Sequence, residues 1–283
     1  MGNGDCMMPL QTKNNYRRWC LDDIAFDAVD LTLIRNDEFL FLTLASASFV
    51  EILAEIYSNN LIKHFRGNTE VTDWLRDFWQ QEEMQHGRAL KAYVQAVWPE
   101  FDWESAHCAF RTQYGLLCTV EQLESNRALE LVGRCVVETG TSTFYRALCN
   151  YIKEPVLREL VDHIKGDEAA HYAHFLRYFA AYNARERHGV MAVIAAILRR
   201  LREIRQDDAY IAFKHVFAAR HPGQPFLESD WRRYNRTVKR LARRHYPYSM
   251  AARMLIKPIP MSSKLKRIVH RPLVILAQLV SLG

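Results

Sequence analysis

Two short elements with the pattern Glu-x-x-His constrain this chain more than any other feature of its sequence. They occupy residues 83–86 and 168–171 and read EMQH and EAAH. Positions i and i+3 lie one above the other on a helix face, so each element offers a carboxylate and an imidazole to one point in space. Each element therefore supplies half of a metal site and requires a partner helix.

A lone glutamate precedes each element by about the length of a helix hairpin. Glu51 lies 32 residues before Glu83, and Glu138 lies 30 residues before Glu168. This spacing fits about four helical turns, a reversal and about four turns back, which brings the two carboxylates of a hairpin to one depth. The first reversal is predicted at residues 66–69.

Four carboxylates and two imidazoles are then expected to converge, a donor set that suits iron or manganese better than zinc or calcium. The six predicted ligands are Glu51, Glu83, His86, Glu138, Glu168 and His171. Glu55 lies one turn after Glu51 on the same helix face and is an alternative first ligand.

A third Glu-x-x-His pattern occupies residues 104–107. A rival ligand order would combine it with Glu70 and Glu138. Pro99 places a helix start shortly before Glu104, whereas ligands in the core of a bundle need mid-helix positions. Glu104 is therefore interpreted as a first-turn residue that interacts with the helix dipole.

The helix pattern extends over most of the chain, and no stretch alternates as a strand would. The sequence predicts helices over 39–64, 71–97, 104–117, 120–151 and 154–184. The expected fold class is all-α, with two ligand-bearing hairpins and further helices towards the C-terminus.

Residues around the ligands carry a family resemblance. The segments at 79–87, 138–141 and 167–171 read WQQEEMQHG, ETGT and DEAAH, and Tyr57 follows Glu51 by six residues. They resemble the soluble acyl-carrier-protein desaturases, in which these elements read W-x-x-E-E-x-R-H-G, E-x-x-T and D-E-x-R-H. These enzymes belong to the ferritin-like di-iron carboxylate superfamily.

The resemblance covers about residues 38 to 180 and implies a ferritin-like four-helix bundle that binds two iron ions. Gln85 and Ala170 depart from it, because the family commonly has arginine before the ligand histidine. The ligand roles that it implies are bridging carboxylates at Glu83 and Glu138, a Glu51–His86 pair on one iron and a Glu168–His171 pair on the other. Loss of Glu138 is then expected to release both irons.

Two further residues acquire roles from the resemblance. Asp167 matches an acid that holds a ligand histidine on the electron route, and a carboxylate can fix an imidazole ligand by accepting its far N–H. Thr141 matches a threonine on the oxygen side of the cluster. Its hydroxyl could equally bond a carbonyl one turn back.

The implied function is oxygen-dependent oxidation of an acyl chain, as in a fatty acyl-ACP desaturase that introduces a cis double bond. Acyl carrier protein and a ferredoxin-type electron donor are the expected partners, and a homodimer is the expected assembly. The alternatives are another di-iron oxygenase (a hydroxylase, N-oxygenase or enzyme that cleaves aldehydes or fatty acids) and a ferroxidase or iron-binding protein without organic substrate.

Cysteine usage and the N-terminal sequence favour a cytoplasmic protein. The six cysteines form no C-x-x-C pair, which excludes a rubredoxin-type iron–sulfur domain and indicates reduced thiols. The first 20 residues contain no apolar stretch of the kind found in signal peptides. The predicted divisions are a flexible arm over 1–20, the di-iron bundle over 21–187 and a basic helical extension over 188–283.

Charge is divided unevenly along the chain. Residues 199–283 contain 19 basic and 5 acidic side chains, whereas residues 1–198 contain 19 and 27. A solvated helix face, an acidic carrier protein or an anionic membrane surface would each explain the excess, and without a reader motif no nucleic-acid partner is expected. The apolar run at 272–282 is too short to span a bilayer. It is expected to lie at a membrane interface, on the bundle or on a second subunit.

Overall fold

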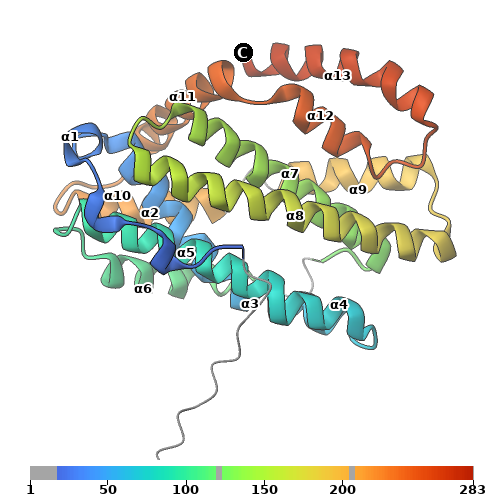
Figure 1. Cartoon of the computed structure of the whole chain (residues 1–283), viewed down its shortest axis with the longest axis horizontal. Helices are drawn as coiled ribbons and strands as arrows, with labels where there is room; N and C mark the ends of the chain where they lie inside the picture. Colours follow the sequence, from blue (N-terminus) through green and yellow to red (C-terminus); the bar gives the residue numbers. More distant parts are fainter. Residues whose placement is uncertain (1–17, 119–122, 204–207, 283) are drawn as a thin grey trace, which may run out of the picture.

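The computed structural model describes residues 18–118, 123–203 and 208–282, and its regular elements are helices (Figure 1). No strand occurs in these three stretches. The predicted all-α fold class is therefore confirmed for the described part of the chain.

The first hairpin begins with α2 (Glu38–Ile52) and α3 (Ala54–His64). Asp37 starts α2 by accepting a hydrogen bond from the backbone N–H of Leu40, as an N-cap does. The single helix predicted over 39–64 is divided at Leu53, two residues after Glu51. The reversal falls at the predicted residues, and Gly67 takes the positive φ of 92° that the turn requires.

The return helix of this hairpin contains a π-helical turn. It runs as α4 (Thr69–Trp74), a π turn over Leu75–Trp79 and α5 (Gln80–Val97). Such turns add one residue to the α-helical count and are frequent at functional sites. This one ends four residues before Glu83, so the helix changes its register directly before the first ligand element.

The second hairpin consists of α7 (Arg127–Tyr151) and α8 (Pro155–Glu186), which pack along their lengths. The side chain of Asn126 caps α7, which explains why the helix starts later than the predicted residue 120. Glu154 caps α8 by accepting from two backbone amides, and Pro155 occupies a favourable first-turn position.

Helices α2 and α5 approach each other closely at the depth of the ligands. A Cβ atom on Gly87 would lie 2.4 Å from the backbone nitrogen of Ile52. Only glycine fits this contact, which places the backbone beside Glu51 directly against the helix that carries His86.

Apolar side chains form two clusters, at opposite ends of the ligand helices. One includes Phe41 and Leu90, and the other includes Phe65 and Phe175. Along α5, α7 and α8 the ligands fall where one cluster gives way to the other. The bundle therefore holds its buried polar residues near mid-height, with apolar packing above and below.

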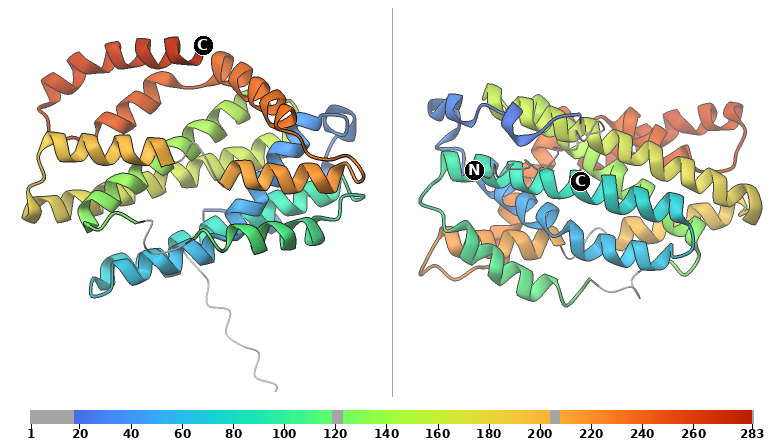
Figure 2. Two further views of the ribbon diagram at one scale, coloured as in Figure 1. Left: turned by 180° about the vertical axis from the view of Figure 1, so that it is seen from behind. Right: turned by 60° about the horizontal axis from the view of Figure 1, so that its bottom comes forward.

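The remaining long helices cover this bundle (Figure 2). They are α6 (Trp103–Tyr114), α9 (Val190–Glu203), α10 (Asp208–Arg220), α11 (Glu228–His245), α12 (Tyr248–Ile256) and α13 (Ser263–Leu282). Helices α9, α11 and α12 pack on α7, and α10 packs on α2 and α6. The predicted C-terminal extension thus contributes to the same core, with Phe213 of α10 fully buried.

The last described residues of the predicted flexible arm over 1–20 are packed on the bundle rather than free. Residues 1–17 lie outside the described part, but Trp19 is 3% exposed and packs against the bundle. The short elements η1 (Leu21–Asp23), η2 (Phe26–Ala28) and α1 (Leu31–Ile34) then lead to α2. The burial of Trp19 was not predicted, because the surrounding segment is polar and a single tryptophan gives no periodic signal.

One stretch of the described residues, Glu38–His64, is long and apolar enough to cross a membrane by length and composition. Two thirds of its most apolar window are buried inside the bundle. Its apolar residues are therefore accounted for as core residues of α2 and α3.

Candidate metal centre

The six predicted ligand residues converge in the core, and none is more than 8% exposed. They form two groups, and within each group one ligand atom from every residue lies within 4.8 Å of the others. The first group is Glu51, Glu83, His86 and Glu168, and the second is Glu83, Glu138, Glu168 and His171. Each group could hold one metal ion. Glu55, the alternative first ligand, is exposed and belongs to neither group.

Glu83 and Glu168 belong to both groups, whereas the family resemblance implies bridging by Glu83 and Glu138. Each hairpin gives its lone glutamate and its histidine to one group, and the glutamate of its Glu-x-x-His element to both. The reason is that α5 and α8 face each other across the site, so the carboxylates of their two elements meet between the groups. Glu138 lies on α7, to one side, and reaches only the second group.

Both imidazoles direct Nδ1 into the site. His86 Nδ1 lies 3.3 Å from Glu168 Oε1, and His171 Nδ1 lies 3.1 Å from Glu83 Oε1. Their Nε2 atoms point away and meet carboxylates, at 3.1 Å from Asp167 and 2.8 Å from Glu82.

These outer carboxylates link the two hairpins. Asp167 of α8 meets His86 of α5, and Glu82 of α5 meets His171 of α8. Each outer acid directly precedes a shared glutamate in the sequence. The contact predicted for Asp167 is present, whereas Glu82 was not predicted, although its position matches that of Asp167.

Four buried atoms of the site make no hydrogen bond: His86 Nδ1, His171 Nδ1, Glu138 Oε2 and Glu168 Oε1. Buried polar atoms without partners cost about 1–3 kcal/mol each. All four face the centre of the two groups. A pair of cations placed there would satisfy them, so the donor set fits a two-metal site.

The concentration of buried carboxylates changes their protonation. Burial, and then the neighbouring Glu83, raise the pKa of Glu51 well above its ordinary value. Burial also raises the pKa of Glu168, with Glu138 adding to the effect. Although burial lowers it, the hydrogen bond to Asp167 and the neighbouring carboxylate of Glu168 raise the pKa of His86 to about 10. The pocket therefore favours positive charge, as protons or as metal ions.

Hydroxyl groups hold three of the ligand carboxylates. Tyr145 donates to Glu51 at 2.8 Å, and Tyr57 donates to Glu83 at 3.1 Å. Thr141 donates to Glu168 at 2.5 Å. The Thr141 hydroxyl also lies 3.3 Å from the carbonyl oxygen of Glu138, so the alternative contact with a carbonyl one turn back is present as well. Tyr145 was not predicted, because an aromatic residue at a helical spacing reads as ordinary core.

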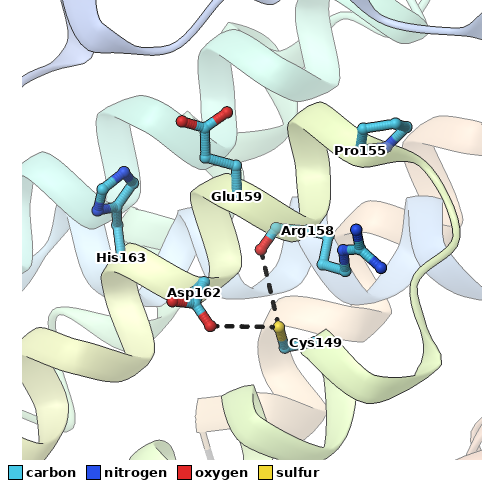
Figure 3. Close-up of a pocket in the computed structure, with 6 residues that line it drawn as sticks. All are labelled: Cys149, Pro155, Arg158, Glu159, Asp162 and His163. Atoms are coloured by element: carbon cyan, nitrogen blue, oxygen red, sulfur yellow. Dashed lines mark hydrogen bonds between the residues drawn. The ribbon is translucent and has the colours of Figure 1, made fainter.

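Trp19 connects this site with the surface. Its Nε1 donates to Asp167 at 2.7 Å, and its ring stacks parallel to His86 with 6.2 Å between centroids. The Trp19 ring also stacks on His163, with 5.2 Å between centroids. His163 lines a surface pocket of about 560 Å³ (Figure 3). The four side chains His163, Trp19, Asp167 and His86 therefore form a continuous path from that pocket to the ligands.

The third Glu-x-x-His element lies apart from the centre, as interpreted from the sequence. Glu104 is exposed in the first turn of α6 and pairs with Lys91. His107 stacks on Trp103 at 4.4 Å and lines a separate pocket of about 250 Å³. Neither residue belongs to either of the two ligand groups.

Comparison of the chain with protein-family models, with curated proteins and with solved structures gives no match in any of the three. The assignment of a function therefore depends on the residues of the site.

Proposed function

We propose that this chain is a ferritin-like di-iron oxidase that uses dioxygen to oxidise an acyl chain, as an acyl-ACP desaturase does. The observation that supports this most strongly is the pair of ligand groups that share Glu83 and Glu168. Two shared carboxylates, two further carboxylates and two imidazoles form a donor set for two transition-metal ions at one site.

Iron is favoured over zinc or calcium by the donors themselves. Structural zinc sites commonly use thiolates, and the cysteines of the described residues lie outside both groups. Calcium prefers oxygen donors alone, whereas each group contains an imidazole. Manganese satisfies the same preferences and is the control metal in the experiment below.

Two iron ions bound here would supply the activation of dioxygen that oxidation of an unactivated C–H bond requires. The protein would fix the ligands. Tyr145, Tyr57 and Thr141 orient three carboxylates, and Asp167 and Glu82 hold the imidazoles in the tautomer that leaves Nδ1 free to bind. The apolar clusters on either side exclude water.

The path from Trp19 to His86 supports an external electron donor. The sequence contains no C-x-x-C pair of the kind that a rubredoxin-type centre uses, so the proposal includes a separate electron donor. The stacked rings of His163 and Trp19 lead from the surface to Asp167 and His86. We propose that a ferredoxin-type donor delivers electrons at this face of the molecule.

Helix α11 supports the choice of an acidic carrier. It contains seven basic residues besides its final histidine, and most of them are exposed. They are Arg232, Arg233, Arg236, Lys239, Arg240, Arg243 and Arg244. Acyl carrier protein is strongly acidic, so its surface would complement this helix and accelerate the encounter.

The test combines metal analysis with an activity assay. Protein loaded anaerobically with ferrous iron is expected to bind two irons per chain. With ferredoxin, its reductase, NADPH and oxygen, it is expected to convert acyl-ACP into an unsaturated product that mass spectrometry detects. Manganese-loaded protein is the matched control and should give no product.

Two results would contradict the proposal. A protein that binds two irons but oxidises many equivalents of free ferrous iron and accumulates mineral is a ferroxidase. A hydroxylated or cleaved product in place of an alkene would keep the di-iron site and replace the desaturase assignment.

A further inference from the structure

Helix α13 presents an apolar stripe to solvent. The helix lies along one outer side of the molecule and packs on α12 and α11 (Figures 1 and 2). Five of its large apolar side chains are between 43% and 60% exposed: Leu265, Ile268, Ile275, Leu276 and Leu279. Large apolar side chains of a surface helix normally face the core, so a group of exposed ones on one helix indicates a binding surface.

The five side chains share one face of the helix. At about 100° per residue, their positions fall within a sector of about 100°. The residues that are partly buried, including Val269, His270 and Leu273, fall on another side. His270 there lies 3.0 Å from the carbonyl oxygen of Ser249, which fixes the rotation of the helix. The apolar stripe is thus directed outwards by the packing of the opposite side.

Positive charge follows one edge of the stripe. Lys264, Arg267 and Arg271 are exposed, and the helical positions place them next to the apolar sector. Between Ser263 and Leu282 the sequence contains no Asp or Glu. One edge of the stripe is therefore cationic, and no acidic residue of α13 lies near it.

We propose that this face of α13 binds the surface of a bilayer that contains anionic lipids. A single outward helix with an aliphatic sector and a cationic border is the arrangement of interfacial helices, whose apolar face enters the boundary between headgroups and acyl chains. Anionic headgroups complement the three cations. The surface does not depend on the metal centre, and it would hold the enzyme beside a lipid phase.

The experiment uses the full chain and vesicle flotation. The wild-type protein should bind vesicles of phosphatidylglycerol and phosphatidylcholine and should not bind vesicles of phosphatidylcholine alone. Replacing Ile275, Leu276 and Leu279 together with serine should weaken binding about tenfold or more, because their burial in the interface is lost. These side chains are exposed, so the fold should be unaffected, which circular dichroism would check.

A second variant tests the cations. Replacing Lys264, Arg267 and Arg271 with glutamine should also weaken binding about tenfold or more at low salt, since each cation near an anionic surface adds to the affinity. Matched controls carry the same changes on other helices. They are Met191→Ser with Leu198→Ser on α9, where both side chains are exposed, and Lys63→Gln with Arg88→Gln on the first hairpin.

Three outcomes would overturn the proposal. The first is no binding of the wild-type protein to anionic vesicles, and the second is binding that survives the serine variant. The third is a wild-type dimer, seen by sedimentation, that the serine variant dissociates without any change in vesicle binding. In that case the stripe contacts a second copy of the chain.

Discussion

His86 Nε2 lies 3.1 Å from Asp167 Oδ2, so the residue next to one shared ligand holds the histidine of the opposite hairpin. Trp19 donates to the same oxygen at 2.7 Å, and Arg18 lies 3.5 Å from the other oxygen. Although burial raises it, the hydrogen bond from His86 lowers the pKa of Asp167 below its ordinary value. Asp167 is therefore suited to remain ionised and to hold the imidazole in one orientation.

Replacement of Asp167 with asparagine should weaken metal binding at His86 about 10- to 100-fold, as loss of such outer partners does in other metal sites. The measurement is competition with a chelator for ferrous iron under anaerobic conditions. Trp19→Phe is the matched control, because it removes the indole N–H that donates to Asp167 but leaves the hydrogen bond between Asp167 and His86 in place. A variant Asp167→Asn with unchanged iron affinity would show that this carboxylate is not required to orient the ligand.

Metal stoichiometry should distinguish shared from unshared ligands. Glu168→Gln removes a carboxylate common to both groups and should abolish binding of both irons. Glu138→Gln affects the second group alone and should leave about one iron per chain. Iron analysis of the anaerobically loaded variants checks this. Loss of both irons from Glu138→Gln would instead favour the bridging role that the family resemblance implies.

Gly87→Ala should destabilise the metal-free protein by about 1–3 kcal/mol, because the added Cβ would overlap the backbone of Ile52. The separation of α2 and α5 would also displace Glu51 from His86. Urea unfolding measures the change. Gly140→Ala is the matched control, since nothing lies within 4 Å of the position that the new methyl group would take, and a helical alanine should stabilise α7 by up to about 1 kcal/mol.

Tyr145→Phe should cost about 1 kcal/mol of unfolding free energy in the metal-free protein, because Glu51 loses a buried hydrogen bond. Tyr57→Phe, which removes the bond to Glu83, serves as a comparison at the other end of the same group. Equal stability of Tyr145→Phe and wild type in urea would mean that the Glu51 carboxylate is satisfied by another donor.

His107 should make the fold sensitive to acid. Burial lowers its pKa from the ordinary 6.5 to about 4. Below pH 6.5 the unfolded chain binds a proton that the folded state does not accept until about pH 4, so stability is fully present above pH 6.5 and falls towards pH 4. The loss should be about 1–2 kcal/mol after allowance for solvent screening of a half-exposed group.

The measurement for His107 is urea unfolding of wild type and His107→Leu at pH 7.5 and pH 4.5. The carboxylates of the metal centre contribute equally to both proteins, so the difference between their pH dependences isolates His107. Parallel pH dependences would contradict the prediction.

The ligand set can be recognised in the sequence because its members depart from the usual apolar composition of a core helix at regular positions. Charged residues interrupt helices that are otherwise suited to a core, and they do so at i, i+3 and at one hairpin depth. Glu51, Glu83 and Glu138 could be recognised on that basis. Which two glutamates belong to both ligand groups could not be recognised in the same way. It depends on how α5 and α8 face each other rather than on distance along the chain.

The residues that were missed give only weak local signals. Glu82 is an acid on a helix that carries many polar side chains, and only its place before Glu83, like that of Asp167 before Glu168, distinguishes it. Trp19 lies 67 residues before His86, in a segment whose composition suggests an arm. Its position is decided by tertiary packing on the imidazole and on His163.

The π turn at Leu75–Trp79 would allow one residue to be deleted from this helix without displacing the ligands that follow it. Deleting one residue within the turn would restore an ordinary α-helix and leave Glu83 and His86 held by their partners. The part before the turn would instead rotate by about 100°, which would carry Trp74 away from His174, on which it stacks at 4.8 Å. In evolutionary terms, the turn is equivalent to the insertion of one residue. The insertion alters the direction of the side chains before the turn and leaves the positions of the ligands after it unchanged.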